Sequence, residues 1–175
     1  MKKLFLCLLL VFISITAFPK DYSISEIGLA HIKSYESCKL TSYRDMDGYY
    51  TIGWGHHSKS VRPGERITQA RADQLFREDI RRIEVSANRL LRNLPYEYEF
   101  SQGFFDGFCS MVYNCGEGGI QKSLFYSKLK RCRVTDGVMN IEDFNYTLSL
   151  VKNTKAPTSH HRKRRLAEYE MMMKL

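Results

Sequence analysis

The sequence lacks several patterns that would assign it to a common class of active site. It has no Cys-x2-Cys and no His-x3-His spacing, so the pairs His56-His57 and His160-His161 form no recognisable metal motif. It has no Gly-x-Ser-x-Gly elbow of the serine hydrolases, no internal repeat and no low-complexity tract. We therefore expect neither a metal nor another cofactor, and we look for chemistry among the remaining polar side chains.

A hydrophobic run long enough to span a membrane is also missing. The longest run, residues 4–18, has fifteen apolar positions after Lys2 and Lys3, whereas a spanning helix needs roughly 20. A positive start followed by such a run is typical of a signal peptide. We expect two parts: residues 1–20 as a signal peptide or N-terminal membrane segment, and residues 21–175 as one catalytic domain. The protein should then be exported to the periplasm or the extracellular space.

The cleavage site of this segment is not evident. Thr16 and Ala17 are candidates, but neither gives a clean small-x-small pattern, so an uncleaved anchor stays an alternative. Without residues 1–20 the chain carries 24 Lys and Arg against 19 Asp and Glu, a net charge of +5. This charge favours nucleic acid, a membrane surface or a cell-wall polymer, and export makes nucleic acid the least suitable of the three.

Cysteine is present in a number that permits disulfides. Cys7 lies in the apolar run, and the other four could form one or two disulfides in an oxidising compartment, with three connectivities open. Alternatively, Cys109 is a small buried hydrophobe on an apolar helix face. The other three are Cys38, Cys115 and Cys132.

The hydrophobic pattern changes from helical to alternating and back again. A capping box, Ser23 to Glu26, predicts a helix to about residue 35, and residues 40–52 predict strands around a turn at 46–48. Thr68 should cap a long helix that ends before Pro95. Further helices are expected near residues 97–113, 122–132, 141–152 and 160–174. This order predicts an α+β fold with a small antiparallel sheet in its own lobe, against a multi-helix lobe.

Two carboxylates and a hydroxyl accompany the predicted sheet. Glu36 follows the first helix, Asp45 follows the first strand, and Thr51 lies in the returning strand. Taken singly, each has an ordinary structural explanation: a solvated charge, a turn residue and a strand former. Brought together by a hairpin, they suit acid/base hydrolysis of a glycosidic bond.

This stretch resembles the phage-type lysozyme (endolysin) family, glycoside hydrolase family 24. The family shares a Glu, an Asp and a Thr at these separations, followed by Thr-Ile-Gly-aromatic-Gly-His, here Thr51 to His56. Ser37, where the family usually has Gly, and Trp54, where it usually has Tyr, are departures. Weaker matches lie at residues 62–68, 72–79, 113–116 and 164–168.

The resemblance implies a lysozyme-like fold and a muramidase that cleaves peptidoglycan, with Glu36 as acid and with Asp45 and Thr51 placing water. We assign Trp54, His56 and Asn114 to substrate binding, although His56 equally suits a hydrogen bond within the fold. We expect a monomer, with transient inner-membrane association through residues 4–18. The competing interpretations are a lytic transglycosylase, a chitin-directed hydrolase and an inactive wall-binding protein.

Overall fold

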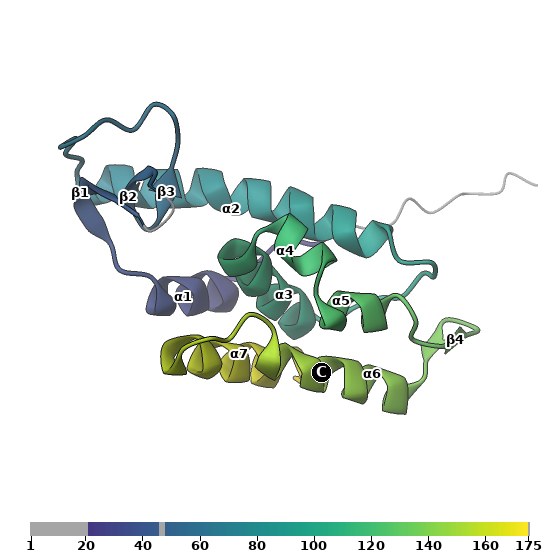
Figure 1. Ribbon diagram of the computed structural model, residues 1–175. Helices are drawn as coiled ribbons and strands as arrows, with labels where there is room; N and C mark the ends of the chain where they lie inside the picture. Colours follow the sequence, from purple (N-terminus) through teal and green to yellow (C-terminus); the bar gives the residue numbers. More distant parts are fainter. Residues whose placement is uncertain (1–20, 46–47, 175) are drawn as a thin grey trace, which may run out of the picture.

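The computed structural model describes residues 21–45 and 48–174 of the chain (Figure 1). The predicted signal segment at 1–20 and the turn residues 46 and 47 lie outside the described residues. The fold is α+β, as predicted: a small antiparallel sheet lies at one end of a long helix, and a second, buried helix at residues 102–115 packs between the long helix and the C-terminal helix (Figure 1).

The described part of the chain first forms α1, Glu26–Tyr35, which packs against the helix at residues 102–115 and which Ser25 caps through a hydrogen bond from the Gly28 N–H. Three strands follow in the order β1-β2-β3, all antiparallel: β1 is Lys39–Arg44, β2 is Tyr50–Gly53 and β3 is His56–His57. The helix α1 therefore begins at Glu26, because Ser25 and not Ser23 supplies its N-terminal cap.

The helix α2, Gln69–Arg92, connects the two lobes. Thr68 caps it as predicted, and the helix ends at Arg92, three residues before Pro95. Its first half packs against β2 and β3 and its second half against α3 and α4. The apolar side of α2 is therefore shared between the two lobes.

The helical lobe is built around α3, Gln102–Cys115, which is buried along most of its length. The remaining elements are α4 (Glu117–Gln121), α5 (Leu124–Leu129), β4 (Val134–Thr135), β5 (Val138–Met139), α6 (Ile141–Ser149), η1 (Leu150–Asn153) and α7 (Ser159–Met172). A Cβ on Gly107 of α3 would lie 2.9 Å from the Glu168 carbonyl oxygen, so this glycine allows α3 and α7 to approach closely.

Three details of the helical lobe differ from the prediction. The second long helix begins at Gln102 rather than near 97, because Ser101 is its cap. The helix expected at 122–132 is the shorter α5, which Ser123 caps, and the short helix α4 before it was not predicted. The hairpin β4–β5 was not predicted; Asp136 and Gly137 form its turn, both with positive φ.

The main hydrophobic core lies in the helical lobe. Phe104, Phe108 and Phe125 stack in it, all at most 1% exposed. The four described cysteines are free thiols: Cys109 and Cys132 are buried and Cys38 and Cys115 are half-buried. Cys109 is thus the small buried hydrophobe that we considered. Among the described residues, no helix is long and apolar enough to cross a membrane.

Candidate active site

The β1–β2 hairpin holds Asp45 and Thr51 together. The Thr51 hydroxyl donates to Asp45 Oδ2 at 2.9 Å, and the Tyr49 backbone N–H donates to Asp45 Oδ1 at 2.8 Å. Thr51 is 4% exposed, so its hydroxyl has little freedom to turn elsewhere. Donors to both carboxylate oxygens suit an ionised Asp45 whose orientation is fixed by the hairpin itself.

Glu36 is the C-terminal cap residue of α1, with extended backbone angles that turn the chain toward β1. Its Oε1 accepts a hydrogen bond from Nη1 of Arg164 on α7, at 2.5 Å. The Arg164 side chain is 2% exposed and that of Glu36 is 23% exposed. A buried guanidinium thus fixes a carboxylate that still reaches the solvent.

A buried polar cluster between α3 and α7 holds Arg164 in turn. Its Nε lies 3.2 Å from Glu168 Oε1, and its Nη2 donates to the Ser110 carbonyl oxygen at 3.3 Å. Arg165 Nη1 also lies 2.6 Å from Glu168 Oε2, and Glu168 is fully buried. Burial raises the pKa of Glu168, while the charges of Arg165 and Arg164 act in the opposite direction. Glu168 therefore orients the guanidinium group of Arg164 that binds Glu36.

The turn between β2 and β3 lies next to Oε2 of Glu36, whereas Arg164 contacts Oε1. A Cβ on Gly55, whose φ is +101°, would lie 3.9 Å from Glu36 Oε2 and 3.6 Å from the Tyr113 hydroxyl oxygen. The Tyr113 hydroxyl donates to the Trp54 carbonyl oxygen at 2.6 Å. Glu36 Oε1 thus contacts Arg164, and Oε2 faces this turn.

Two tyrosines near the carboxylates were not predicted as site residues. Tyr43 pairs with Thr51 across β1 and β2. Burial raises the pKa of Tyr43, and the charges of Asp45 and Glu36 raise it further. Burial likewise raises the pKa of Tyr113, followed by the charge of Glu36. Tyr43 therefore lies within electrostatic range of both carboxylates and, as the cross-strand partner of Thr51, on the same face of the sheet.

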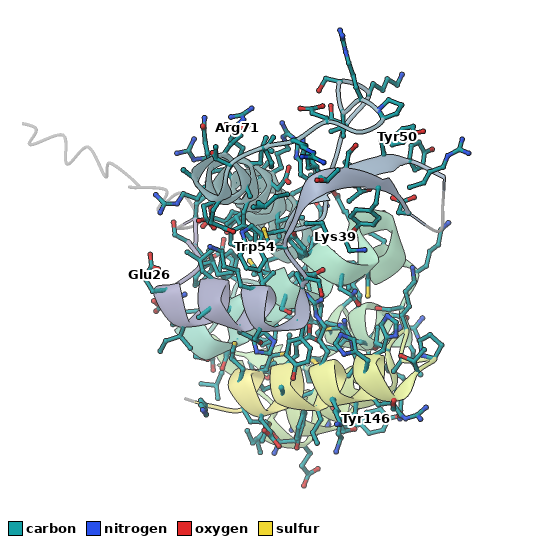
Figure 2. The ribbon with its side chains drawn as sticks, turned by 90° about the vertical axis from the view of Figure 1, so that its left-hand side faces the viewer. Glu26, Lys39, Tyr50, Trp54, Arg71 and Tyr146 are labelled. Atoms are coloured by element: carbon teal, nitrogen blue, oxygen red, sulfur yellow. The ribbon has the colours of Figure 1, made fainter. Side chains whose placement is uncertain are left out.

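Trp54 lies between α1 and α2 at the junction of the lobes (Figure 2). Its indole N–H donates to Asp73 Oδ1 at 2.8 Å, and Lys33 Nζ lies 4.9 Å from its ring centroid. Lys33 also contacts Asp73 at 2.7 Å. The hydrogen bond from Lys33, and then the one from Trp54, lower the pKa of Asp73. The polar edge of Trp54 is thus engaged within the protein.

The two other residues assigned to substrate binding differ in accessibility. His56 is 7% exposed, and its Nδ1 lies 2.8 Å from Asp79 Oδ2 on α2, which matches the alternative of a hydrogen bond within the fold. Asn114 is exposed at the end of α3, and its Oδ1 accepts from Arg165 at 2.5 Å. Substrate binding by Trp54, His56 and Asn114 stays a prediction. No group of three or more His, Cys, Asp or Glu in the described part of the chain is arranged to hold a metal ion.

A sequence profile described as phage lysozyme matches residues 33–168, which include Glu36, Asp45, Thr51 and Arg164. The chain belongs to the phage lysozyme family. This assignment confirms the resemblance found in the sequence and makes the protein a glycoside hydrolase by family.

Individual relatives agree with the assignment. The chain is 33% identical over 147 residues to the endolysin of Acyrthosiphon pisum secondary endosymbiont phage 1, covering 83% of this chain and 94% of that protein. It is 32% identical over 103 residues to the endolysin of Bacillus phage B103, covering 58% of this chain but 37% of that protein. This phage lysozyme homologue therefore spans well under half the length of the Bacillus phage relative.

The fold also matches solved structures. The muramidase domain of SpmX from Asticaccaulis excentricus superposes with a TM-score of 0.71 at 23% identity, covering 88% of this chain and 99% of that domain. A similarity at this identity shows the fold. The described residues thus have the same architecture as that domain.

Proposed function

We propose that this phage lysozyme homologue is an endolysin that hydrolyses the β-1,4 bond between N-acetylmuramic acid and N-acetylglucosamine in peptidoglycan. The family and its endolysin members support a wall-hydrolysing enzyme. The observation that carries the proposal is the pairing of the Thr51 hydroxyl with Asp45, next to a turn that faces Glu36. These are the groups that water-dependent cleavage of an acetal requires.

Glu36 serves as the general acid in this proposal. Cleavage of the sugar–sugar bond requires a proton on the leaving oxygen while positive charge develops on the ring. Oε1 is engaged by Arg164, so the proton is delivered from Oε2, which faces Gly55. Arg164 acts as a positioning residue, because it contacts the carboxyl and not the substrate.

Asp45 and Thr51 place the attacking water. Asp45 enters the reaction as a carboxylate and accepts a proton from the attacking water. The Thr51 hydroxyl donates to one oxygen of this carboxylate and so fixes its orientation. The water adds its oxygen to the anomeric carbon as the bond to the leaving oxygen breaks. Hydrolysis gives a reducing end, so this arrangement favours a hydrolase over a transglycosylase.

The decisive test is a zymogram on purified peptidoglycan with the wild type, Glu36→Gln and Asp45→Asn. We expect Glu36→Gln to fold normally and to lose nearly all lytic activity, and Asp45→Asn and Thr51→Ala to be strongly impaired. Wild-type activity of Glu36→Gln would refute the assignment, and absence of activity in the wild type would favour a wall-binding protein. Mass spectrometry of the digest separates a hydrolase, which leaves reducing ends, from a transglycosylase, which leaves anhydro ends.

The domain division and the location belong to the same proposal. We infer that residues 21–175 form the catalytic domain of a monomer and that residues 1–20 direct export or tether the protein at the inner membrane. The composition of residues 1–20, two lysines before an apolar run, supports this. N-terminal sequencing of the mature protein distinguishes a cleaved signal from a retained segment. If the protein cleaved chitin and not peptidoglycan, the proposed bond specificity would be wrong, whereas the assignment as a glycoside hydrolase would stand.

A further inference from the structure

The outward side of the second half of α2 carries a row of arginines. α2 has six arginines and no lysine in its sequence. Arg82, Val85, Arg89 and Arg92 follow one another at spacings of three or four, Arg81 lies beside Arg82, and all five are exposed; we name these five residues the arginine face. In Figure 1, α2 runs along one edge of the molecule, so this row lies on the periphery of the helical lobe.

The arginine face is hollowed at its centre. Arg81, Arg82, Val85, Ser86 and Arg89 line a groove of about 390 Å³. Val85 is 58% exposed, and the side chains of Arg82 and Arg89 are 69% and 51% exposed. An apolar side chain is therefore surrounded by guanidinium groups that reach the solvent.

The acidic neighbours of the arginine face lie at its margins. Asp79, Glu117 and Asp21 form ion pairs with Arg82, Arg89 and Arg92 respectively. Within the described part of the chain, Arg81 has no ion pair. The pair between Asp21 and Arg92 is exposed on both sides and contributes little free energy, whereas Asp79 and Glu117 are half-buried. Arg81 and Arg92 are therefore the guanidinium groups for which an outside phosphate competes most easily.

The N-terminal strap, Asp21 to Ser25, begins beside the arginine face. Asp21 contacts Arg92 in the last turn of α2, and the backbone of Tyr22 is bonded to the Asn88 side chain of the same helix. The apolar run at residues 4–18 lies just before this point in the sequence. A chain whose apolar N-terminal segment enters a bilayer would therefore hold the arginine face near the lipid headgroups.

We propose that the arginine face is a docking surface for an anionic phospholipid bilayer. Arginine binds phosphate in a bidentate manner, and basic side chains are attracted to anionic lipid surfaces within a Debye length. Val85 adds an apolar contact at the headgroup level. Docking would hold the catalytic domain against the membrane surface, an inference that rests on the proposed export of the chain.

The arginine face begins about two helical turns from the polar cluster at Trp54. Asp73, which bonds to Trp54, precedes Arg81 by eight residues of α2, or about 12 Å at 1.5 Å per residue, and precedes Arg92 by 19 residues, or about 28 Å. Arg82 shares Asp79 with His56, so circular dichroism, and not lytic activity, serves as the folding control for variants of Arg81 and Arg82.

Arginine footprinting of the full chain tests the proposal. The protein is incubated with phosphatidylglycerol or phosphatidylcholine vesicles, treated with phenylglyoxal and digested for mass spectrometry. We expect modification of Arg81 and Arg82 to slow roughly tenfold on phosphatidylglycerol alone, and 0.5 M NaCl to abolish the protection, because screening weakens such contacts. Exposed Arg131 and Arg162 serve as internal references whose modification rates should not change.

A matched pair of variants completes the experiment. Arg81→Gln/Arg82→Gln should abolish the protection of Arg89 and Arg92, whereas Lys130→Gln/Arg131→Gln, with the same loss of charge, should preserve it. Equal modification rates on the two lipids, equal protection of Arg131 and Arg162, or a failure of the chain to associate with vesicles would overturn the proposal. Equal protection by inorganic phosphate without vesicles would reassign the groove to a small phosphate ligand.

Discussion

At the scale of the residue, Arg164 has the most informative position. It connects Glu36, which is 128 positions away in the sequence, to Glu168 and Ser110 in the core. Its planar group makes contacts in three directions at once, which a lysine ammonium on a flexible stem cannot reproduce. The geometry of the proposed acid thus depends on a side chain from the other end of the chain.

We predict that Arg164→Lys lowers kcat on the order of 100-fold while KM changes little. A misplacement of the acid by about 1 Å is enough for such a loss. Steady-state kinetics on soluble peptidoglycan fragments would show it, with the exposed Arg162→Lys as the matched control. A change in KM alone would instead mean that Arg164 contacts the substrate.

His31 on α1 gives a prediction about pH. Its Nε2 is buried without a hydrogen-bond partner among the described residues, and burial, followed by the charges of Arg164 and Arg165, lowers its pKa to about 4. The unfolded chain binds a proton at His31 below pH 6.5, and the folded chain resists until about pH 4. The contribution of His31 to stability is therefore lost as the pH falls from 6.5 to 4.

We predict that His31→Leu reduces the loss of stability in this range. The gain relative to wild type should reach about 1 to 2 kcal/mol at pH 4, a value reduced because the ring is partly exposed. Urea unfolding at pH 7 and pH 4 measures it, and the exposed His57→Leu is the control. Parallel stability–pH curves for wild type and His31→Leu would contradict the prediction.

The sequence predicted some residues of the candidate site and not others for a physical reason. Glu36, Asp45 and Thr51 lie within sixteen positions, and local hairpin geometry brings Asp45 and Thr51 together. Arg164 and Tyr113 lie in two of the weaker matches to the family, but only the packing of α7 and α3 brings them close to Glu36 and Trp54. The sequence suggested for His56 either substrate binding or a hydrogen bond within the fold, and the partner of that hydrogen bond, Asp79, is visible only in three dimensions.

At the scale of the element, the N-terminal strap shows how an extended segment is held without pairing in a sheet. Asn88 of α2, 6% exposed, accepts from the Tyr22 N–H at 2.9 Å and donates to the Tyr22 carbonyl oxygen at 2.8 Å. Asp106 of α3 accepts from the Ser25 N–H at 2.8 Å. Two helices thus satisfy the backbone of the segment that precedes α1.

We predict that Asn88→Ala destabilises the fold by about 2 kcal/mol, because it leaves the part-buried N–H and carbonyl of Tyr22 unpaired. Thermal unfolding measures this, with the exposed Asn153→Ala as control. Lytic activity well below the unfolding temperature should stay at the wild-type level, since Asn88 lies 15 residues along α2 from Asp73, the residue of α2 that bonds to Trp54. An unchanged melting temperature would mean that the strap detaches without cost.

The elements that the sequence pattern missed share one cause. Periodicity detects long amphipathic helices such as α2, but β4 and β5 have two residues each and are too short to show a period. Their turn, Asp136-Gly137, was the available signal. The start of α3 was misplaced because Phe100 continues the four-residue spacing of Phe104 and Phe108 and stacks on Phe104, although it precedes the cap residue Ser101.

At the scale of the whole molecule, α2 is the connection between the two proposed functions. Its first half supports the sheet and the turn at Trp54, and its second half carries the arginine face. Lys33 of α1, Asp73 of α2 and Trp54 meet where the lobes join. Movement of one lobe relative to the other must therefore break contacts to Asp73.

Trp54 is the single tryptophan, so its fluorescence reports on this junction. In the wild type we expect urea transitions followed by Trp54 fluorescence and by far-UV circular dichroism to coincide, as for one cooperative unit. Asp73→Ala removes the partner of both Lys33 and Trp54, so the fluorescence transition should shift to lower urea than the helical signal. Asp143→Ala, which breaks an ion pair with Arg133 away from the junction, should leave the two transitions coincident. If Asp73→Ala also unfolds in one step by both probes, the lobes are coupled by the apolar contacts of α2 and not by this polar cluster.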